Sequence, residues 1–155
     1  MNVEYINPFI EASQSVLTTM TGIKPGLGQV YIRKAPFASD NVAVIVGLTG
    51  TIRGQVVISL SKKSALSVAS SMMGGMALAE FDEISKSAIS ELANMIMGNT
   101  ATLLASRGIG IEITPPSLLM GENLTITPAN MSTICVPLEL GKGDTMEIDV
   151  SIESK

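Results

Sequence analysis

The sequence predicts an α+β fold, in which an antiparallel β-sheet of about six strands carries two or three long helices packed on one face. Three segments show apolar residues at helical spacing, and others show apolar residues that alternate with polar ones. The links between neighbouring strand-like segments are short enough for hairpins, which join antiparallel strands. At 155 residues, the chain is expected to form a single domain over residues 1–155.

Two of the helix-like segments lie in the first half of the chain. Residues 5–21 carry an apolar stripe at helical spacing. Residues 62–73 follow Ser61, whose hydroxyl can cap the free N–H groups of a helix N-terminus. A Gly-Gly pair at 74–75 then ends this second helix. Asp82 is the corresponding N-cap candidate for the third helix, because a carboxylate also suits the positive end of the helix dipole.

The remaining segments are expected to be strands. The last of them alternates strictly, so that it has one apolar face and one acidic face. A turn at residues 141–143 joins it to the strand before, and residues 118–126 are expected to form a strand pair around residues 121–123. The other predicted strands cover residues 28–35, 42–47, 54–60, 109–114, 131–140 and 145–152.

The longest helix-like segment covers residues 82–107. A turn of about 100° per residue divides it into two sides. Ser87, Glu91 and Asn94 fall on the polar side, and small residues such as Gly98 continue that stripe. This arrangement predicts a flat, exposed face that another protein could approach closely. The opposite side is expected to face the core with Ile89, Leu92, Ala93, Ile96, Thr100, Leu103 and Leu104.

The composition limits the classes of function. The net charge is −4 and only 3% of the residues are aromatic, so nucleic-acid binding is not expected. No apolar run approaches the roughly 18 residues needed to cross a bilayer, and the first residues lack the regions of a signal peptide. We therefore expect a cytoplasmic protein without membrane insertion. The mean hydropathy of +0.41 is compatible with a buried oligomer interface.

The chain contains no His and a single Cys. The absence of His removes the usual general base, the Ser-His and Cys-His nucleophile pairs and the commonest zinc ligand. Cys135 lies in an alternating, strand-like run, where a buried inert thiol is favoured over a redox or nucleophilic role.

The polar stripe of the long helix has the pattern Ser87-x3-Glu91-x2-Asn94. Taken alone, this pattern is typical of an ordinary solvated helix face. Its chemistry is nevertheless specific, because an amide can both donate to and accept from a water molecule and so hold it in line with a phosphoryl group. A nearby carboxylate can pair with a lysine of a partner. Such a site adds one positioned group to a partner's active site.

This pattern resembles that of the CheC/CheX/FliY phosphatases of bacterial chemotaxis, in which a proline follows the asparagine by about 22 residues. Pro116 stands at that place, with 21 residues between it and Asn94. The stretch GQVVISLSKKSALSVASSMMGG, residues 54–75, is similar to the family's strand and following helix, and NPFIEASQSVLTTMTG is similar to its first helix. A single full motif and the chain length are more similar to CheX members than to two-site CheC members.

The resemblance implies that the protein dephosphorylates the aspartyl phosphate of a CheY-like response regulator. Asn94 would orient the attacking water, Glu91 would contact the regulator's active-site lysine, and Ser87 would begin the motif. Magnesium would belong to the regulator, and the chain would need no cofactor of its own. The resemblance also implies a homodimer. The alternative is a catalytically silent scaffold domain that docks a response regulator or a flagellar-switch component.

A second, altered copy of the pattern lies near the N-terminus, as Asn7-x3-Glu11-x2-Gln14. A glutamine can also position a water molecule. The alternative, an ordinary polar face of a core helix, is favoured because the longer side chain of Gln14 would displace the water by more than about an ångström.

Overall fold

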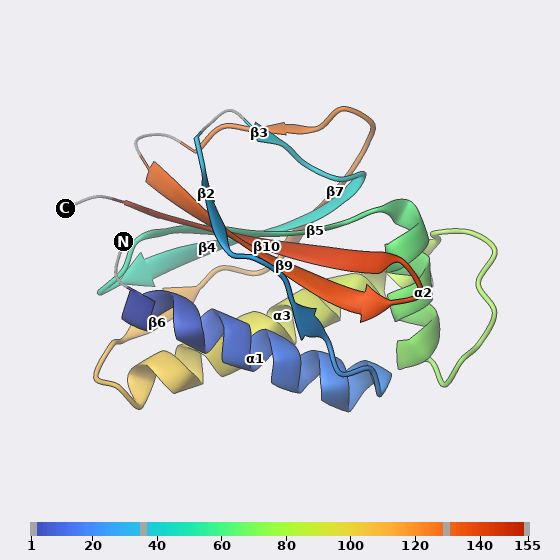
Figure 1. Cartoon of the computed structure of the whole chain (residues 1–155), viewed down its shortest axis with the longest axis horizontal. Coiled ribbons are helices and arrows are strands. Elements are labelled where there is room, and N and C mark those ends of the chain that lie inside the picture. The colour runs from blue at the N-terminus through green and yellow to red at the C-terminus, as the bar shows by residue number, and fades with distance from the viewer. Residues whose placement is uncertain (1–2, 35–36, 129–130, 154–155) are drawn as a thin grey trace.

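The structure, a computed structural model, describes residues 3–34, 37–128 and 131–153. Three helices cover one face of a twisted antiparallel sheet, with α1 and α3 packed side by side beneath it and α2 at one end (Figure 1). The α+β prediction is therefore confirmed. The helices are α1 (Val3–Thr21), α2 (Lys62–Met72) and α3 (Glu83–Ala105). The strands are β1 (Gly26–Leu27), β2 (Tyr31–Arg33), β3 (Phe37–Ala38), β4 (Val42–Gly50), β5 (Gly54–Leu60), β6 (Ile111–Ile113), β7 (Ser117–Met120), β8 (Thr125–Ile126), β9 (Met131–Gly141) and β10 (Asp144–Glu153).

The main sheet has eight strands among the described residues, more than the six expected. Its order is β1-β9-β10-β5-β4-β6, and two further strands share partners, since β2 also pairs with β9 and β7 also pairs with β4. Every pairing is antiparallel. Of the short strands at the two sides of the sheet, β2, β6 and β7 overlap expected ranges, whereas β1 lies outside all of them. A pattern of two residues does not identify a strand.

The strand expected at residues 28–35 is interrupted in the structure. Leu27 pairs with Leu138 and Tyr31 pairs with Cys135, so one residue more lies on the β1–β2 side than on β9. Between these pairs, Gly28 donates to the carbonyl of Pro137 at 2.9 Å. Pro137 has no N–H with which to donate a second hydrogen bond to this segment. The pairing with β9 is therefore interrupted between β1 and β2.

The local strand pair expected at residues 118–126 is wrong. β7 instead pairs with β4, with Val42 opposite Met120, and β8 forms a separate two-stranded sheet with β3. The turn that separates β7 from β8 contains Asn123, which is left-handed at φ 57°. The free edge of β4 takes β7 as a partner, and this long-range pairing is invisible in local sequence.

Helix caps and turns follow the sequence closely. The hydroxyl of Ser61 accepts the N–H of Ser64 at 3.0 Å, and the carboxylate of Asp82 accepts the N–H of Ser85 at 3.0 Å. Hydrogen bonds from the backbone and hydroxyl of Ser85 lower the pKa of Asp82. Glycines with positive φ end α2 and form the β9–β10 turn, where a side chain would be strained.

The main core lies between the helices and the facing side of the sheet. Helix α3 contributes most of the expected arc, but Leu103 is only half-buried and Met97, which was not expected there, is fully buried. The apolar face of β10 is confirmed. Its opposite face is less exposed to solvent than expected, since Asp149 and Ser151 are also buried. The buried residues of α3 are Ser85, Ile89, Leu92, Ala93, Ile96, Met97, Thr100 and Leu104.

Candidate functional site

Helix α3 presents Ser87, Glu91 and Asn94 on one exposed stripe, as the sequence predicts. The apolar side of the helix is held between the sheet and α1, which fixes the direction of the polar side. Among the described residues, neither Glu91 nor Asn94 has a hydrogen-bond or ion-pair partner. Their carboxylate and amide are therefore available to a molecule that approaches from solvent.

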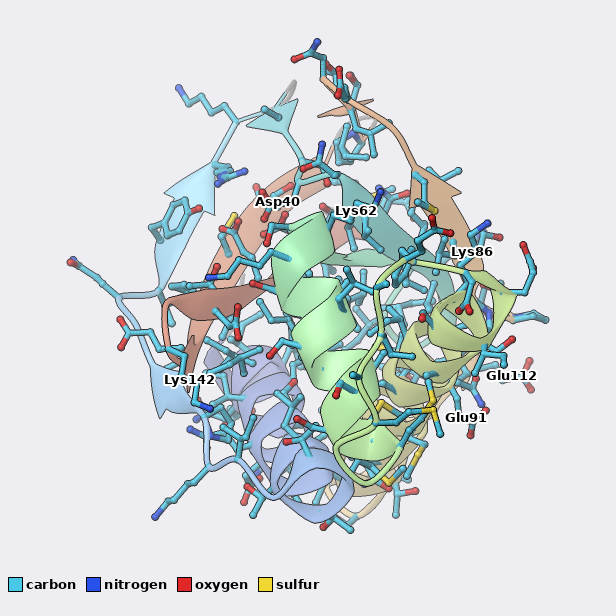
Figure 2. The ribbon with its side chains drawn as sticks, turned by 90° about the vertical axis from the view of Figure 1, so that its right-hand side faces the viewer. Asp40, Lys62, Lys86, Glu91, Glu112 and Lys142 are labelled. Atoms are coloured by element: carbon cyan, nitrogen blue, oxygen red, sulfur yellow. The ribbon has the colours of Figure 1, made fainter. Side chains whose placement is uncertain are left out.

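The stripe forms one side of an open groove of about 760 Å³. Figure 2 shows Lys86 and Glu91 on the side of α3 that is turned away from α1. The other side of the groove comes from the end of β6, the following loop and the start of β7. The lining residues are Glu83, Lys86, Ser87, Ser90, Glu91 and Asn94 from α3, and Ile113, Thr114, Pro115, Pro116 and Leu118 opposite.

The loop opposite α3, residues 114–116, forms what we call the groove wall. Thr114 holds it to β4 by two hydrogen bonds, one from its own N–H to the carbonyl of Gly47 at 3.0 Å, and one from the N–H of Gly47 to its Oγ1 at 2.7 Å. Pro115 and Pro116 follow, and their rings restrict the backbone. The structure thus brings Pro116, the distant element of the sequence pattern, to the same groove as Asn94.

The charges of the groove are two carboxylates and one ammonium. Lys86 pairs with Glu83 at 3.0 Å on the first turns of α3, while Glu91 is unpaired. Both partners of the pair are solvated, so their attraction contributes little to stability. The unpaired carboxylate of Glu91 leaves the middle of the groove negatively charged, which suits a cationic side chain of a partner.

The chemistry available in the groove is positioning rather than nucleophilic attack. Its polar groups are hydroxyls, carboxylates, one ammonium and the amide of Asn94, and the chain contains no His to activate a hydroxyl. The amide can both donate to and accept from a water molecule. An open groove with such a group can complete an active site whose reacting bond is supplied by a partner.

Gly98 continues the stripe beyond the groove and does not line it. It is half-buried, and a Cβ at this position would meet no atom within 4 Å. The glycine therefore leaves the helix surface flat, as the sequence predicts. Sequence analysis did not identify Lys86, Ser90 or Thr114 as lining residues, although the Pro-Pro pair after Thr114 marks a rigid loop.

The altered pattern near the N-terminus has a different environment. Glu11 is paired with Arg107 at 3.4 Å, so its carboxylate is engaged within the chain. Gln14 is half-buried and lines a separate, smaller groove of about 350 Å³ with Lys24 and Pro25. Glu11 does not line that groove. The carboxylate and amide are thus not presented together, in contrast to Glu91 and Asn94.

A second polar cluster lies on the opposite face of the sheet. Tyr31 donates to Glu147, and Arg33 pairs with Glu147 at 3.2 Å. Burial is the main cause that raises the pKa of the Cys135 thiol, and it also raises the pKa of Asp149 to about 6. The raised thiol pKa supports the interpretation of Cys135 as an inert buried thiol, because the nucleophilic form is the thiolate.

The same cluster has the spacing of a metal site. One ligand atom from each of Cys135, Glu147 and Asp149 lies within 4.8 Å of the others, and Oδ1 of Asp149 is buried without a hydrogen-bond partner. Arg33 already supplies a positive charge beside Glu147, which opposes binding of a further cation. The cluster is on the far side of the sheet from α3, so it takes no part in the groove.

No helix among the described residues is both long enough and apolar enough to cross a membrane.

Comparisons with known proteins point to one protein family. The family model described as chemotaxis phosphatase CheX matches residues 42–139, which include the α3 motif and the groove wall. A protein of Thermotoga maritima described as CheY-P phosphatase CheX is 30% identical over 154 residues, which are 99% of each chain.

Solved structures show the same similarity. A CheC-like superfamily protein from Shewanella sp. PV-4 has a TM-score of 0.90 at 27% identity, over 99% of this chain and 100% of that one. The structure described as a CheX-CheY-BeF3-Mg complex from Borrelia burgdorferi contains a chain with a TM-score of 0.83 at 31% identity. The match covers 99% of this chain and 100% of that one. The resemblance inferred from the sequence is confirmed.

Proposed function

The chain belongs to the CheX family of chemotaxis phosphatases, and we propose that it dephosphorylates the aspartyl phosphate of a CheY-like response regulator. The relative from Thermotoga maritima carries the description CheY-P phosphatase, and the relative from Borrelia burgdorferi is in complex with CheY. The observation that carries the proposal is local. Glu91 and Asn94 stand exposed and unpaired on a rigid helix, at a groove open enough to receive part of another protein.

In this proposal, Asn94 orients the attacking water. Its amide accepts one hydrogen bond from the water and donates one to it, so that a lone pair of the water faces the phosphorus. The water oxygen bonds to phosphorus while the bond from phosphorus to the aspartyl oxygen breaks. The regulator recovers its free carboxylate, and inorganic phosphate leaves with both protons of the water. Catalysis of this kind depends on positioning and on charge stabilisation.

Glu91 would pair with the lysine of the regulator's active site and so fix the register of the complex. An ion pair that forms only in the complex contributes to specificity and to the rate of association. Ser87 would contact the regulator one turn earlier on α3, and Gly98 would let its backbone come close one turn later. All four positions lie along one stripe of the helix.

Magnesium would be held by the regulator and not by this chain. The complex from Borrelia burgdorferi contains Mg²⁺ together with CheY. In the groove of this chain, neither carboxylate is left for a metal ion in this proposal. Glu83 is paired with Lys86, and Glu91 would pair with the lysine of the regulator. We expect no cofactor of the chain's own to be needed for hydrolysis.

We also propose that the protein is cytoplasmic and forms a homodimer through the β2 side of its sheet. Among the described strands, β2 pairs only with β9. Its Ile32 is 74% exposed, and Leu27 and Val30 beside it are also exposed. An apolar strand edge of this kind is a template for pairing with another strand.

Multiple turnover separates a phosphatase from a silent scaffold. A small amount of the protein is added to an excess of phosphorylated regulator, and release of inorganic phosphate is followed over time. A catalyst releases several equivalents of phosphate per molecule. A scaffold that only binds the regulator would leave the rate of release at the regulator's own value, and that result would exclude the proposed activity.

A further inference from the structure

The groove wall is bonded to β4 at its first residue, Thr114, and is flanked by the pairings of β6 and β7 with the same strand. Both the N–H and the Oγ1 of Thr114 bond to the backbone of Gly47 in β4, at 3.0 and 2.7 Å. The next two residues, Pro115 and Pro116, have no N–H with which to hold themselves to the sheet. Thr114 is therefore the anchor of the loop between β6 and β7 on this side of the groove.

The two sides of the groove are held by different means. Asn94 lies on a helix of 23 residues whose apolar side is buried, so its place is set by the core. Pro115 and Pro116 lie on a short loop, which is held before them by the bonds of Thr114 and after them by the pairing of Ser117 with Ile45. A shift of the wall would change the width of the groove without moving Asn94.

We propose that Thr114 is a positioning residue, which sets the distance between the groove wall and Asn94 and thereby the place of the regulator's aspartyl phosphate relative to the bound water. The inference rests on the proposed function. Thr114 acts through the wall that follows it and makes no contact with the reacting atoms. Because hydrolysis requires alignment of water, phosphorus and leaving oxygen, a displacement of about 1 Å can reduce the rate by 10- to 100-fold.

Gly47 is the matching half of this anchor. A Cβ on Gly47 would lie 3.0 Å from Cγ2 of Thr114 and 3.3 Å from its Oγ1. The absence of a side chain thus lets the threonine sit against β4. A methyl group at position 47 would push Thr114, and the wall with it, by a few tenths of an ångström. Serine at position 114 lacks Cγ2 and would relieve the closer of these two contacts.

The test uses kcat for phosphate release and, separately, the affinity for regulator carrying beryllofluoride, a phosphoryl mimic. Thr114→Val keeps the shape but leaves the N–H of Gly47 without its acceptor, and we expect kcat to fall by about 10-fold. Thr114→Ser keeps the acceptor and should restore most of kcat. The affinity should change by less than about threefold in both variants, since Glu91 and the α3 face are intact.

Thr21→Val is the matched control. Its hydroxyl likewise accepts a backbone N–H, that of Ile23 at 3.1 Å, but it lies at the end of α1 and outside the groove. The control should lose at least as much stability, because the hydroxyl of Thr21 also donates to the carbonyl of Leu17, and it should keep the wild-type kcat. All variants are compared at a temperature at which each is fully folded, as judged by circular dichroism.

A double-mutant cycle gives an independent readout. Gly47→Ala should lower kcat, and combining it with Thr114→Ser should recover part of the loss, because the methyl group of threonine is gone. A wild-type kcat in Thr114→Val, or equal losses in Gly47→Ala and the double variant, would overturn the positioning role while leaving the phosphatase proposal in place. Absence of hydrolysis by the wild-type protein would overturn both.

Discussion

Asn94 and Pro116 line the same groove from opposite sides, although 21 residues separate them in the chain. The intervening residues complete α3, turn through Gly108 and return as β6 along the edge of β4. The proline thus belongs to the site as part of its wall, while the asparagine belongs to its reactive side. The spacing between Asn94 and Pro116 in the sequence therefore corresponds to two opposite sides of one groove.

Reversal of the charge at Glu91 should weaken binding of the regulator. In Glu91→Lys, an ammonium would face the lysine of the regulator, and like charges in close contact are costly. We expect the affinity for beryllofluoride-activated regulator, measured by isothermal titration calorimetry, to fall by about 10-fold or more. Glu139→Lys, which changes another exposed glutamate, on β9, serves as the control. Equal affinities in the two variants would remove Glu91 from the docking role.

Asp149 should make the free energy of unfolding depend on pH between about 4 and 6. Burial, with the nearby charge of Glu147, raises its pKa to about 6 from an ordinary value of 3.8. The folded protein then binds the proton more tightly than the unfolded chain does. The stabilisation from this proton is fully present below about pH 4 and is lost as the pH rises through 6.

The difference between the wild type and Asp149→Asn isolates this effect. The loss should amount to about 2–3 kcal/mol in the wild type, since each pKa unit corresponds to about 1.4 kcal/mol. Urea unfolding of both proteins at pH 4.5 and 7 measures it, with Asp40→Asn as an exposed control. Parallel pH profiles for the wild type and Asp149→Asn would show that Asp149 does not titrate in this range.

A charge on the β2 edge should separate the proposed homodimer. Ile32→Lys places an ammonium on the most exposed apolar side chain of the strand, and lysines on strand edges oppose edge pairing. Light scattering coupled to size exclusion should show a dimer for the wild type and a monomer for the variant. Leu119→Lys on β7 is the comparison. A dimer that survives Ile32→Lys and separates with Leu119→Lys would place the interface at the other side of the sheet.

Much of this fold could be predicted because its signals are local. Ser61 and Asp82 cap their helices as expected, and β5 has the predicted bounds. The strands that were missed or wrongly paired, such as β7, depend on long-range pairing. Burial of Asp149 could not be read from the alternation of β10, because Tyr31 and Arg33, more than a hundred residues earlier, fold over that face.

The site divides in the same way. Ser87, Glu91 and Asn94 could be placed on one exposed stripe from helical periodicity alone. The environment of the second motif copy required the structure, because the partner of Glu11 is Arg107 from the turn after α3. The role proposed for Thr114 also required the structure, since no local sequence pattern predicts a hydrogen bond with a glycine 67 residues earlier.

The central claim is that Asn94 orients the attacking water, and one comparison tests it most directly. The decay of phosphorylated CheY from the same organism is measured alone, with the wild-type protein and with Asn94→Ala. Because Asn94 is exposed and unpaired, the variant should keep its free energy of unfolding within about 0.5 kcal/mol. We predict that the wild type accelerates decay and that the folded variant loses most of the acceleration. Undiminished acceleration by Asn94→Ala would contradict the account.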